Sequence, residues 1–217
     1  MREFIFFSDF DNTITNKDFY KIVIEKHLGE KGIQLYNDWK AKKMKDVDFL
    51  NMVFSSMDSS EEEVISDILT IPFDMDAHSL IKEIKEAGGD FIILSAGADY
   101  YIKELLEYYG IEGVKIISNP SEYRDGGIHI MQDYDSPYYS DVYGVDKALV
   151  VKDFKDKAKR IFYAGDSGPD LKAAEQADII FAKGTLQKLL KDEGYPFIPI
   201  NSFKEIKDYL VKTEVIK

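Results

Sequence analysis

The 217-residue sequence contains no cysteine, which excludes disulfide bonds, thiol catalysis and cysteine-ligated zinc. Its three histidines, His27, His78 and His129, lie far apart and form no metal-ligand pattern, so we treat them as non-catalytic. No apolar run approaches the roughly 20 residues of a membrane span. Residues 1–8 have the pattern of a strand rather than of a secretory signal. We therefore expect a soluble, cytoplasmic protein with no membrane partner.

Positive charge is also scarce. Lys and Arg number 28 against 40 Asp and Glu, which gives a net charge of −12. A protein that binds duplex nucleic acid needs a basic surface, so this balance argues against a nucleic-acid partner. It does not exclude a phosphorylated small molecule, because a bound metal ion can supply local positive charge. The length allows one large domain or a core with an insertion, and a homodimer is left open.

The sequence does contain short apolar runs that alternate with amphipathic helical segments. The first run, Phe4–Phe7, has no polar position and is typical of a strand buried on both faces of a parallel sheet. Further runs follow at residues 90–94, 114–120, 160–165, 178–182 and 197–200. This alternation predicts an α/β fold with a Rossmann-like parallel sheet flanked by helices. A small hairpin is expected around residues 125–127.

The distance between the first two predicted strands indicates an insertion. About 80 residues separate them, whereas a simple strand–helix–strand crossover takes about 30. The intervening residues are mainly helical in pattern, including a capped helix start at Ser59 or Ser60. We predict a helical-bundle cap at residues 15–80, inserted after the first strand of a core formed by residues 1–14 and 81–217.

Polar side chains follow several of the predicted strands, at the edge where ligand sites of open α/β sheets lie. They are Asp9 and Asp11 after the first strand, Ser95 with Ala96 and Gly97 after the second, Lys147 at a helix start, and Asp166 and Asp170 within GDSGPD. Alone, an Asp-x-Asp after a strand is either a hydrated turn or the start of a metal-assisted active site. The second acidic motif favours the active site, and we expect these residues to converge.

In order and spacing, these motifs resemble those of the haloacid dehalogenase superfamily of phosphohydrolases, over nearly the whole chain. The segment DFDNTIT is similar to the first family motif, Ser95 in IILSAG to the second, Lys147 to the third and GDSGPD to the fourth. The inserted helices resemble the small helical cap of the phosphoserine-phosphatase-like branch. Within that branch, the DFDNTIT and GDSGPD segments are most similar to small-metabolite phosphatases of the methylthiopentenyl-phosphate type.

The resemblance implies a Mg²⁺-dependent phosphatase that acts on a small phosphorylated metabolite through an aspartyl-phosphate intermediate. Asp9 would be the nucleophile, since a carboxylate nucleophile splits a slow hydrolysis into two easier steps. Asp11 would protonate the leaving alcohol and later deprotonate water. Ser95 and Lys147 would complete the catalytic set, the lysine by restraining the Asp9 carboxylate and the serine by donating to phosphoryl oxygens.

The same resemblance implies the binding sites for phosphate and metal. The phosphate would be bound by the Ser95 hydroxyl, the main-chain N–H groups of Ala96 and Gly97, and the Lys147 ammonium. Mg²⁺ prefers oxygen ligands, with few of them from protein. The metal site would comprise the side chains of Asp9 and Asp166, the carbonyl of Asp11, and Asp170 supporting the ligands from behind.

Two other functions fit part of the pattern. A phospho-accepting receiver module in signalling also uses an aspartate, an acidic Mg²⁺ site, a hydroxyl and a lysine. Such modules are about half this length and do not carry the aspartate in an Asp-x-Asp after the first strand. A phosphomutase, which transfers the phosphoryl group between metabolites, is the third alternative.

Two aromatic segments have no assigned role at this point. The tyrosine-rich stretch from Tyr134 to Tyr143 either packs on the surface or lines a substrate pocket, and packing is the favoured interpretation. Trp39 with Lys40, Lys42 and Lys43 is expected to form a solvated helix face. The functional alternative for this second segment is a cap surface that closes over the substrate.

Overall fold

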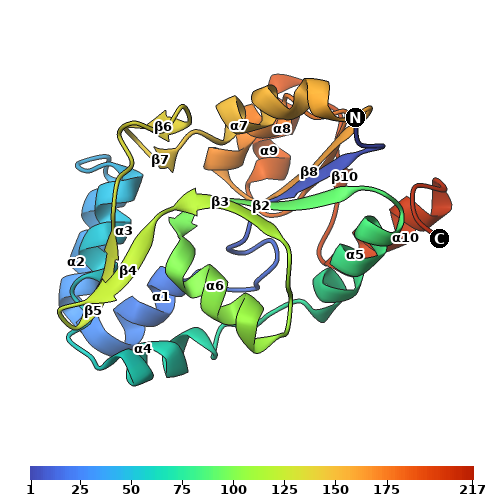
Figure 1. The fold of residues 1–217 in the computed structure, drawn as a ribbon. Coiled ribbons are helices and arrows are strands. Elements are labelled where there is room, and N and C mark those ends of the chain that lie inside the picture. The colour runs from blue at the N-terminus through green and yellow to red at the C-terminus, as the bar shows by residue number, and fades with distance from the viewer.

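The fold of residues 1–217, given by a computed structural model, has a six-stranded parallel sheet at its centre (Figure 1). The strand order is β10-β9-β8-β1-β2-β3. The strands are β1 (Ile5–Ser8), β2 (Asp90–Ala98), β3 (Lys115–Asn119), β8 (Ile161–Gly165), β9 (Ile179–Ala182) and β10 (Ile198–Pro199). The predicted Rossmann-like sheet is therefore confirmed, with the first strand near its middle.

Strand β1 is held from both sides and on both faces. It pairs with β2 through Phe6 and Phe91, and with β8 through Phe6 and Phe162. The Phe6 ring stacks on Phe91 with ring centroids 5.3 Å apart. On the opposite face, Phe7 packs edge-on against Phe154 at 5.7 Å. Because the whole strand is buried, the residues that follow it are fixed at the centre of the sheet edge.

Helices cover both faces of the sheet, as expected for right-handed crossovers. One face carries α5 (Met75–Glu86), α6 (Asp99–Tyr108) and α10 (Phe203–Lys212), and the other carries α7 (Lys147–Phe154), α8 (Leu171–Ala174) and α9 (Leu186–Glu193). Two short 3₁₀ helices occupy Lys155–Lys157 and Gly168–Asp170. No helix is long and apolar enough to cross a membrane.

The segment between β1 and α5 is helical, as the sequence predicts. It contains α1 (Phe19–Val23), a π-helical turn (Ile24–Leu28), α2 (Gly29–Lys40), α3 (Asp46–Phe54) and α4 (Glu61–Ile68). Helix α4 begins with a capping box, in which the Ser60 hydroxyl accepts from the Glu63 N–H and the Glu63 carboxylate accepts from the Ser60 N–H. The expected helix start is therefore Ser60 rather than Ser59.

The chain enters and leaves the inserted helices through two adjacent segments. Thr15 and Phe73 form an antiparallel bridge. The Asp74 N–H donates to the Ile14 carbonyl over 2.9 Å, and the Asn16 N–H donates to the Pro72 carbonyl over 2.8 Å. The inserted helices are thus joined to the core by a narrow, paired connection.

A hairpin from the second half of the chain packs on the inserted helices. It consists of β4 (Ser121–Arg124) and β5 (Gly127–Ile130), and its turn lies where the sequence predicts it. In this turn Asp125 and Gly126 have positive φ. The Ile130 N–H donates to the Asn51 side chain of α3 over 2.8 Å. This contact places the hairpin beside the inserted helices (Figure 1). The boundaries of the cap at residues 15 and 80 stay a prediction.

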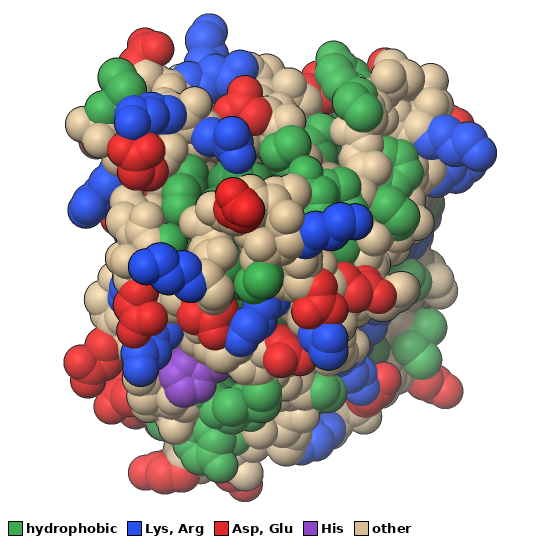
Figure 2. All heavy atoms as spheres, turned by 90° about the vertical axis from the view of Figure 1, so that its right-hand side faces the viewer, with side chains coloured by type: hydrophobic (Ala, Val, Ile, Leu, Met, Phe, Trp, Pro, Cys, Tyr) green, Lys and Arg blue, Asp and Glu red, His purple; other side chains and the backbone are tan.

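The outer face near α5 and α10 carries both signs of charge. Figure 2 shows Lys, Arg, Asp and Glu side chains interspersed on this face, with no large area of one sign. The Lys207 ammonium of α10 pairs with the Glu83 carboxylate of α5 over 2.5 Å and ties the two helices together. This face therefore lacks the basic area that a nucleic-acid surface requires.

Candidate active site

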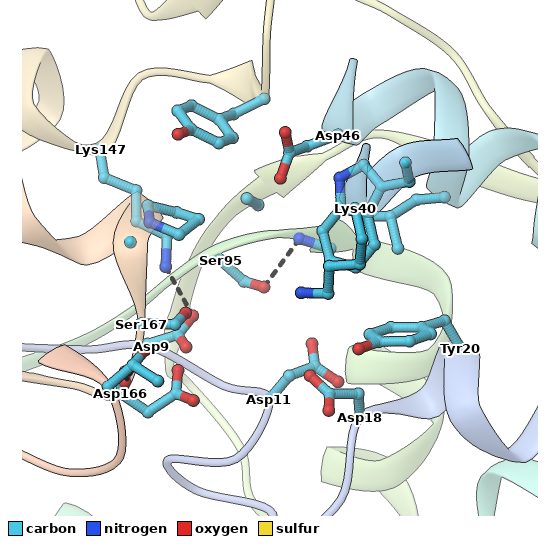
Figure 3. A pocket seen from close by; sticks show the side chains of 18 of the residues that line it. Asp9, Asp11, Asp18, Tyr20, Lys40, Asp46, Ser95, Lys147, Asp166 and Ser167 are labelled. Atoms are coloured by element: carbon cyan, nitrogen blue, oxygen red, sulfur yellow. Dashed lines mark hydrogen bonds and ion pairs between the residues drawn. The ribbon is translucent and has the colours of Figure 1, made fainter. Parts of the chain in front are cut away.

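A cavity of about 300 Å³ opens at the carboxyl edge of the sheet, between the core and the inserted helices. Seven of the eight residues predicted for the site line it, namely Asp9, Asp11, Ser95, Ala96, Gly97, Lys147 and Asp166. The eighth, Asp170, is fully buried directly behind them. Residues from four separate segments therefore converge as predicted (Figure 3).

Lys147 lies at the centre of the site, where it pairs with one aspartate from the first motif and one from the last. It is the first residue of α7, and its ammonium lies 2.6 Å from Asp9 Oδ1 and 2.7 Å from Asp170 Oδ1. The lysine is 4% exposed. Burial disfavours its charged form, but the carboxylates of Asp170 and Asp9 outweigh this effect and raise the pKa of Lys147. The ammonium is thus a permanent cation beside Asp9.

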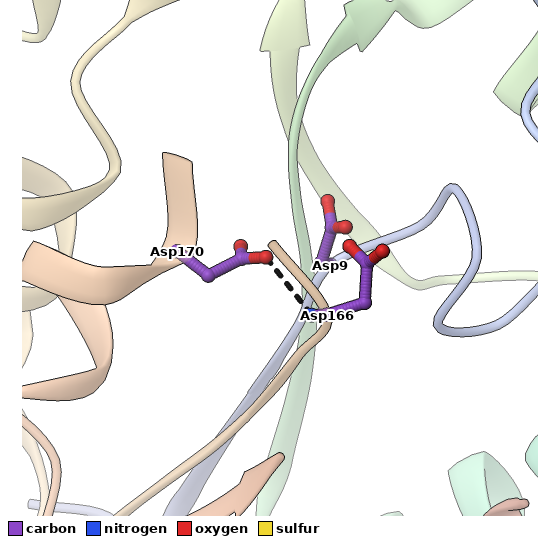
Figure 4. Close-up of side chains that lie close together, drawn as sticks. All are labelled: Asp9, Asp166 and Asp170. Carbon is purple, nitrogen blue, oxygen red and sulfur yellow. Dashed lines mark hydrogen bonds between the residues drawn. The ribbon is translucent and has the colours of Figure 1, made fainter. Parts of the chain in front are cut away.

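Asp170 is a positioning group whose oxygens are fully engaged. Its Oδ1 accepts from Lys147 and from the Tyr163 hydroxyl, and its Oδ2 accepts from the main-chain N–H groups of Asp166 and Ser167 at 3.0 Å each. A Cβ on Gly165 would lie 2.6 Å from the Asp170 side chain, so only glycine fits there. These contacts agree with a supporting role behind the metal ligands and orient the GDSGPD loop (Figure 4).

The carboxylates of Asp9, Asp166 and Asp170 form a cluster that could hold a metal ion. One oxygen from each lies within 4.8 Å of the others. Burial, with the charge of the neighbouring carboxylates, raises the pKa of both Asp9 and Asp166. Buried carboxylates that face one another need a compensating cation, and a set of hard oxygen donors suits Mg²⁺. The donor set therefore fits the predicted ion, and Asp9 and Asp166 would be its side-chain ligands.

Asp11 lies outside that cluster, on the side of the cavity toward the inserted helices (Figure 3). Its carboxylate accepts from the Tyr101 hydroxyl over 2.5 Å and from the Phe19 N–H over 3.3 Å. Burial, followed by the charge of Asp18, raises the pKa of Asp11 to about 7. A carboxyl group with such a pKa can give and take a proton near neutral pH, as a general acid and base must.

The segment 95–97, which is predicted to bind phosphate, lies within β2 rather than after it, and this corrects the expected strand end at residue 94. The pairing of β2 with β3 shifts between Leu94 and Ala98, so the residues in between leave the regular ladder. Within this irregularity the Gly97 N–H donates to Ser95 Oγ over 3.0 Å. The strand continues beyond this point because its last residue, Ala98, pairs again with Asn119.

Asn119, at the end of β3, was missed by the sequence interpretation. Its amide donates to the Ala96 carbonyl over 2.7 Å and to the Tyr143 carbonyl over 2.9 Å. A Cβ on Gly144 would lie 1.9 Å from the Asn119 side chain, so glycine leaves the room for this contact. The sequence did contain a signal that could have identified Asn119 as a site residue, since it is a polar residue at the carboxyl end of a predicted strand.

The two aromatic segments differ from expectation in part. Trp39, Lys40 and Lys42 line the cavity with Tyr20, so this segment borders the site, as the functional alternative expected, while the two lysines stay exposed. Lys43 alone points elsewhere and pairs with Asp38. The tyrosine-rich stretch contains β6 (Tyr139–Ser140) and is followed directly by β7 (Gly144–Val145), and of its tyrosines only Tyr143 lines the cavity. The remaining tyrosines pack or lie exposed, as favoured.

The fold and the site together define a Rossmann-like α/β protein whose acidic residues gather at the carboxyl edge of a parallel sheet. The family model of the haloacid dehalogenase-like hydrolases matches residues 6–175. The chain belongs to this family, which confirms the resemblance of its four motifs.

Curated relatives match along nearly their whole length. The chain is 24% identical over 204 residues to the 2-hydroxy-3-keto-5-methylthiopentenyl-1-phosphate phosphatase of Bacillus cereus, covering 93% of each protein. It is 27% identical over 219 residues to the phosphatase of the same name from Geobacillus kaustophilus, covering 99% of each. Both of these relatives are named as phosphatases.

Solved structures support the same fold. A substrate-bound phosphoserine phosphatase superimposes with a TM-score of 0.68 at 18% identity, covering 96% of this chain and 98% of that one. A phospho-aspartyl intermediate analogue of phosphoserine phosphatase gives a TM-score of 0.66 at 19% identity, with the same coverage. The helical insertion is consistent with this fold.

Proposed function

We propose that the protein is a Mg²⁺-dependent phosphatase that hydrolyses the phosphate monoester of a small metabolite through an aspartyl-phosphate on Asp9. The observation that carries the proposal is the position of Asp9. It stands at the end of the central strand, 2.6 Å from a buried lysine, in a cavity that it shares with Ser95 and Asp166. A carboxylate held beside a cation and a second acid is equipped to attack a phosphate ester.

The proposed reaction has two displacements at phosphorus. A carboxylate oxygen of Asp9 forms a bond to phosphorus while the bond to the leaving oxygen breaks, and Asp11 gives its proton to that oxygen. Water then attacks the same phosphorus, passing a proton to Asp11, while the bond to Asp9 breaks and inorganic phosphate is released. Asp11 thereby returns to its protonated form, and the raised pKa of this group suits both steps.

The chain's own donors and ligands stabilise the charge that develops. Asp9 and Asp166 would hold Mg²⁺, which neutralises phosphoryl oxygens and aligns them for displacement when it is bound. Lys147 keeps the Asp9 carboxylate in place. Ser95, whose hydroxyl lies in the cavity wall, would donate to a phosphoryl oxygen.

The substrate is proposed to be a small phosphorylated metabolite. The cavity holds about 300 Å³ and is bounded on one side by the inserted helices. That volume suits a metabolite rather than a folded protein or a duplex. Since the relatives are named for 2-hydroxy-3-keto-5-methylthiopentenyl-1-phosphate, this compound heads the panel of substrates to test.

The test is phosphate release by the purified protein with Mg²⁺ and with EDTA, on p-nitrophenyl phosphate and on the metabolite panel. Asp9→Asn should lower kcat by at least about 10⁴-fold, since the nucleophile is lost. The matched control is Asp156→Asn, the same change at an exposed position, which should leave activity unchanged. Full activity of Asp9→Asn would overturn the proposed nucleophile.

The same assay separates the two alternative functions. A receiver-like module would retain its phosphoryl group for hours instead of releasing phosphate promptly. A phosphomutase would place the phosphoryl group on an acceptor metabolite rather than on water. Prompt release of one phosphate for each ester cleaved is the result expected for the phosphatase.

A further inference from the structure

Asp11 is held by groups from two different parts of the molecule. The Tyr101 hydroxyl of α6, which packs on the sheet, donates to Asp11 Oδ2 over 2.5 Å. The N–H of Phe19, the first residue of α1 in the inserted helices, donates to Asp11 Oδ1 over 3.3 Å. Of these two contacts, the one from Tyr101 is the shorter. The orientation of the Asp11 carboxylate therefore depends mainly on this hydroxyl.

Tyr101 is itself fixed by its surroundings. The residue is 1% exposed. Its ring lies 6.1 Å from the Phe10 ring of the core, and 5.1 Å and 5.8 Å from the rings of Phe19 and Phe54 in the inserted helices. A ring enclosed on both sides cannot change rotamer without displacing its neighbours. The hydroxyl is thus presented to Asp11 from a rigid support.

Gly97 leaves the space that this contact needs. A Cβ on Gly97 would lie 1.9 Å from the Tyr101 hydroxyl and 3.1 Å from Asp11 Oδ2. Any side chain at position 97 would therefore push the tyrosine away from the aspartate. The phosphate-binding segment and the Tyr101–Asp11 contact are fitted to each other at this point.

We propose that Tyr101 is a positioning residue that aims the Asp11 carboxyl at the leaving-group oxygen of the substrate. The inference rests on the proposed phosphatase function and deepens it. The tyrosine donates to Oδ2 and the Phe19 N–H donates to Oδ1, so the two donors together fix the rotation of the carboxyl group. Asp11 then passes its proton to the leaving oxygen as the bond between that oxygen and phosphorus breaks. Without the hydroxyl, the carboxyl group rotates and proton transfer loses its alignment.

The test uses aryl phosphates of similar shape and graded leaving groups, namely phenyl, p-nitrophenyl and 2,4-dinitrophenyl phosphate. A poor leaving group needs its proton, and a good one departs without it. The value of kcat/KM reports the steps up to the departure of the leaving group, so it isolates proton donation from later hydrolysis. Tyr101→Phe removes one oxygen atom and keeps the ring contacts with Phe10, Phe19 and Phe54.

We expect Tyr101→Phe to lower kcat/KM on phenyl phosphate by at least about tenfold, a share of the 10²–10⁴-fold contribution of a general acid. On 2,4-dinitrophenyl phosphate the change should stay within about twofold. Retained activity on this activated ester also shows that the variant is folded. The matched control is Tyr100→Phe. The Tyr100 hydroxyl donates to Glu61 over 2.7 Å, and Tyr100 does not line the cavity. This variant should not lower kcat/KM on any of the three esters.

An equal loss on all three esters would overturn the inference, because a structural role alone predicts it. No loss on any ester would overturn it as well. If Tyr101→Phe does not fold, Tyr101→Leu takes its place, and the same contrast between phenyl phosphate and 2,4-dinitrophenyl phosphate decides. Two results separate this inference from the proposed function. Full activity of Asp9→Asn would contradict the proposed function. If Asp9→Asn is inactive and Tyr101→Phe loses activity equally on all three esters, only the role of Tyr101 is contradicted.

Discussion

The cavity has two halves whose side chains are held in different ways. The core half, formed by Asp9, Ser95, Lys147 and Asp166, comes from strand ends and a helix start, and its first three residues are 1–5% exposed. The cap half comes from the inserted helices and is more open to solvent, with Lys40 and Lys42 exposed. The cap half consists of Asp18, Tyr20, Trp39, Lys40, Lys42, Asp46, Leu50 and Phe54.

This contrast separates two tasks. Groups fixed by several partners, such as Lys147 between two carboxylates, are suited to chemistry that is the same for every phosphate ester. Exposed and less constrained groups are suited to contact with the variable part of the substrate. Substitutions in the core half should therefore affect all substrates alike, whereas those in the cap half should change their ranking.

The largest effect is expected for Lys147→Met in the core half. It removes the cation between Asp9 and Asp170, and breaking a buried ion pair costs about 3–5 kcal/mol of stability. Activity should fall about 10²–10³-fold on every ester, since a charge-stabilising donor is lost. Urea unfolding and kcat/KM on three or more substrates measure both. The control Lys159→Met breaks an exposed pair with Glu3 and should change stability by less than about 1 kcal/mol.

A smaller effect concerns Asp11, where the two halves meet. Its pKa is raised from 3.8 to about 7 by burial and by Asp18, so the folded state binds the proton more tightly than the unfolded state does. The stability that this provides is full below about pH 4 and is lost as the pH rises through about 7. Asp11→Asn stays neutral, so its stability relative to the wild type should rise by about 1–3 kcal/mol over that range.

Urea unfolding in EDTA from pH 4 to pH 8 measures this difference. Asp156→Asn, the same substitution at an exposed position, serves as the control for the change of residue itself. A difference between Asp11→Asn and the wild type that stays constant from pH 4 to pH 8 would contradict the burial of this carboxyl group.

The smallest effect is expected in the cap half, for Lys40→Ala. The Lys40 ammonium lies 4.1 Å from the centroid of the Trp39 ring, at an exposed site where such contacts contribute about 0.5–1 kcal/mol. KM should change by about two- to fivefold and to different extents across the metabolite panel, with kcat on p-nitrophenyl phosphate nearly unchanged. Lys43→Ala, a neighbouring lysine outside the cavity, is the control. A uniform loss of kcat would contradict the division of tasks.

The sequence predicted the core half well because strand ends in a parallel sheet are adjacent in space. Asp9, Lys147 and Asp166 were expected to converge, and they do. Their residue types also carry recognisable chemistry, since two spaced acids and a lysine have few structural uses at a buried edge. The sheet was predicted from short, continuous apolar runs, which lack the three- and four-residue spacing of an amphipathic helix.

The cap half could not be predicted in the same way. Helical periodicity shows which face of a helix is apolar, but not how the inserted helices rotate over the core. Trp39 was therefore assigned to a solvated face although it borders the cavity. Tyr101 fitted the apolar stripe of α6 and gave no sign that its hydroxyl contacts Asp11. Such contacts depend on packing between segments far apart in the chain.

The most direct test of the account is to trap the phosphoryl group on the protein. Asp11→Asn should form the aspartyl-phosphate from 2,4-dinitrophenyl phosphate, whose leaving group needs no acid, and hydrolyse it slowly because the base is absent. Acid quenching and peptide mass spectrometry should then find one phosphoryl group on the peptide that contains Asp9. A phosphoryl group on another residue, or turnover without any phosphorylated peptide, would contradict it.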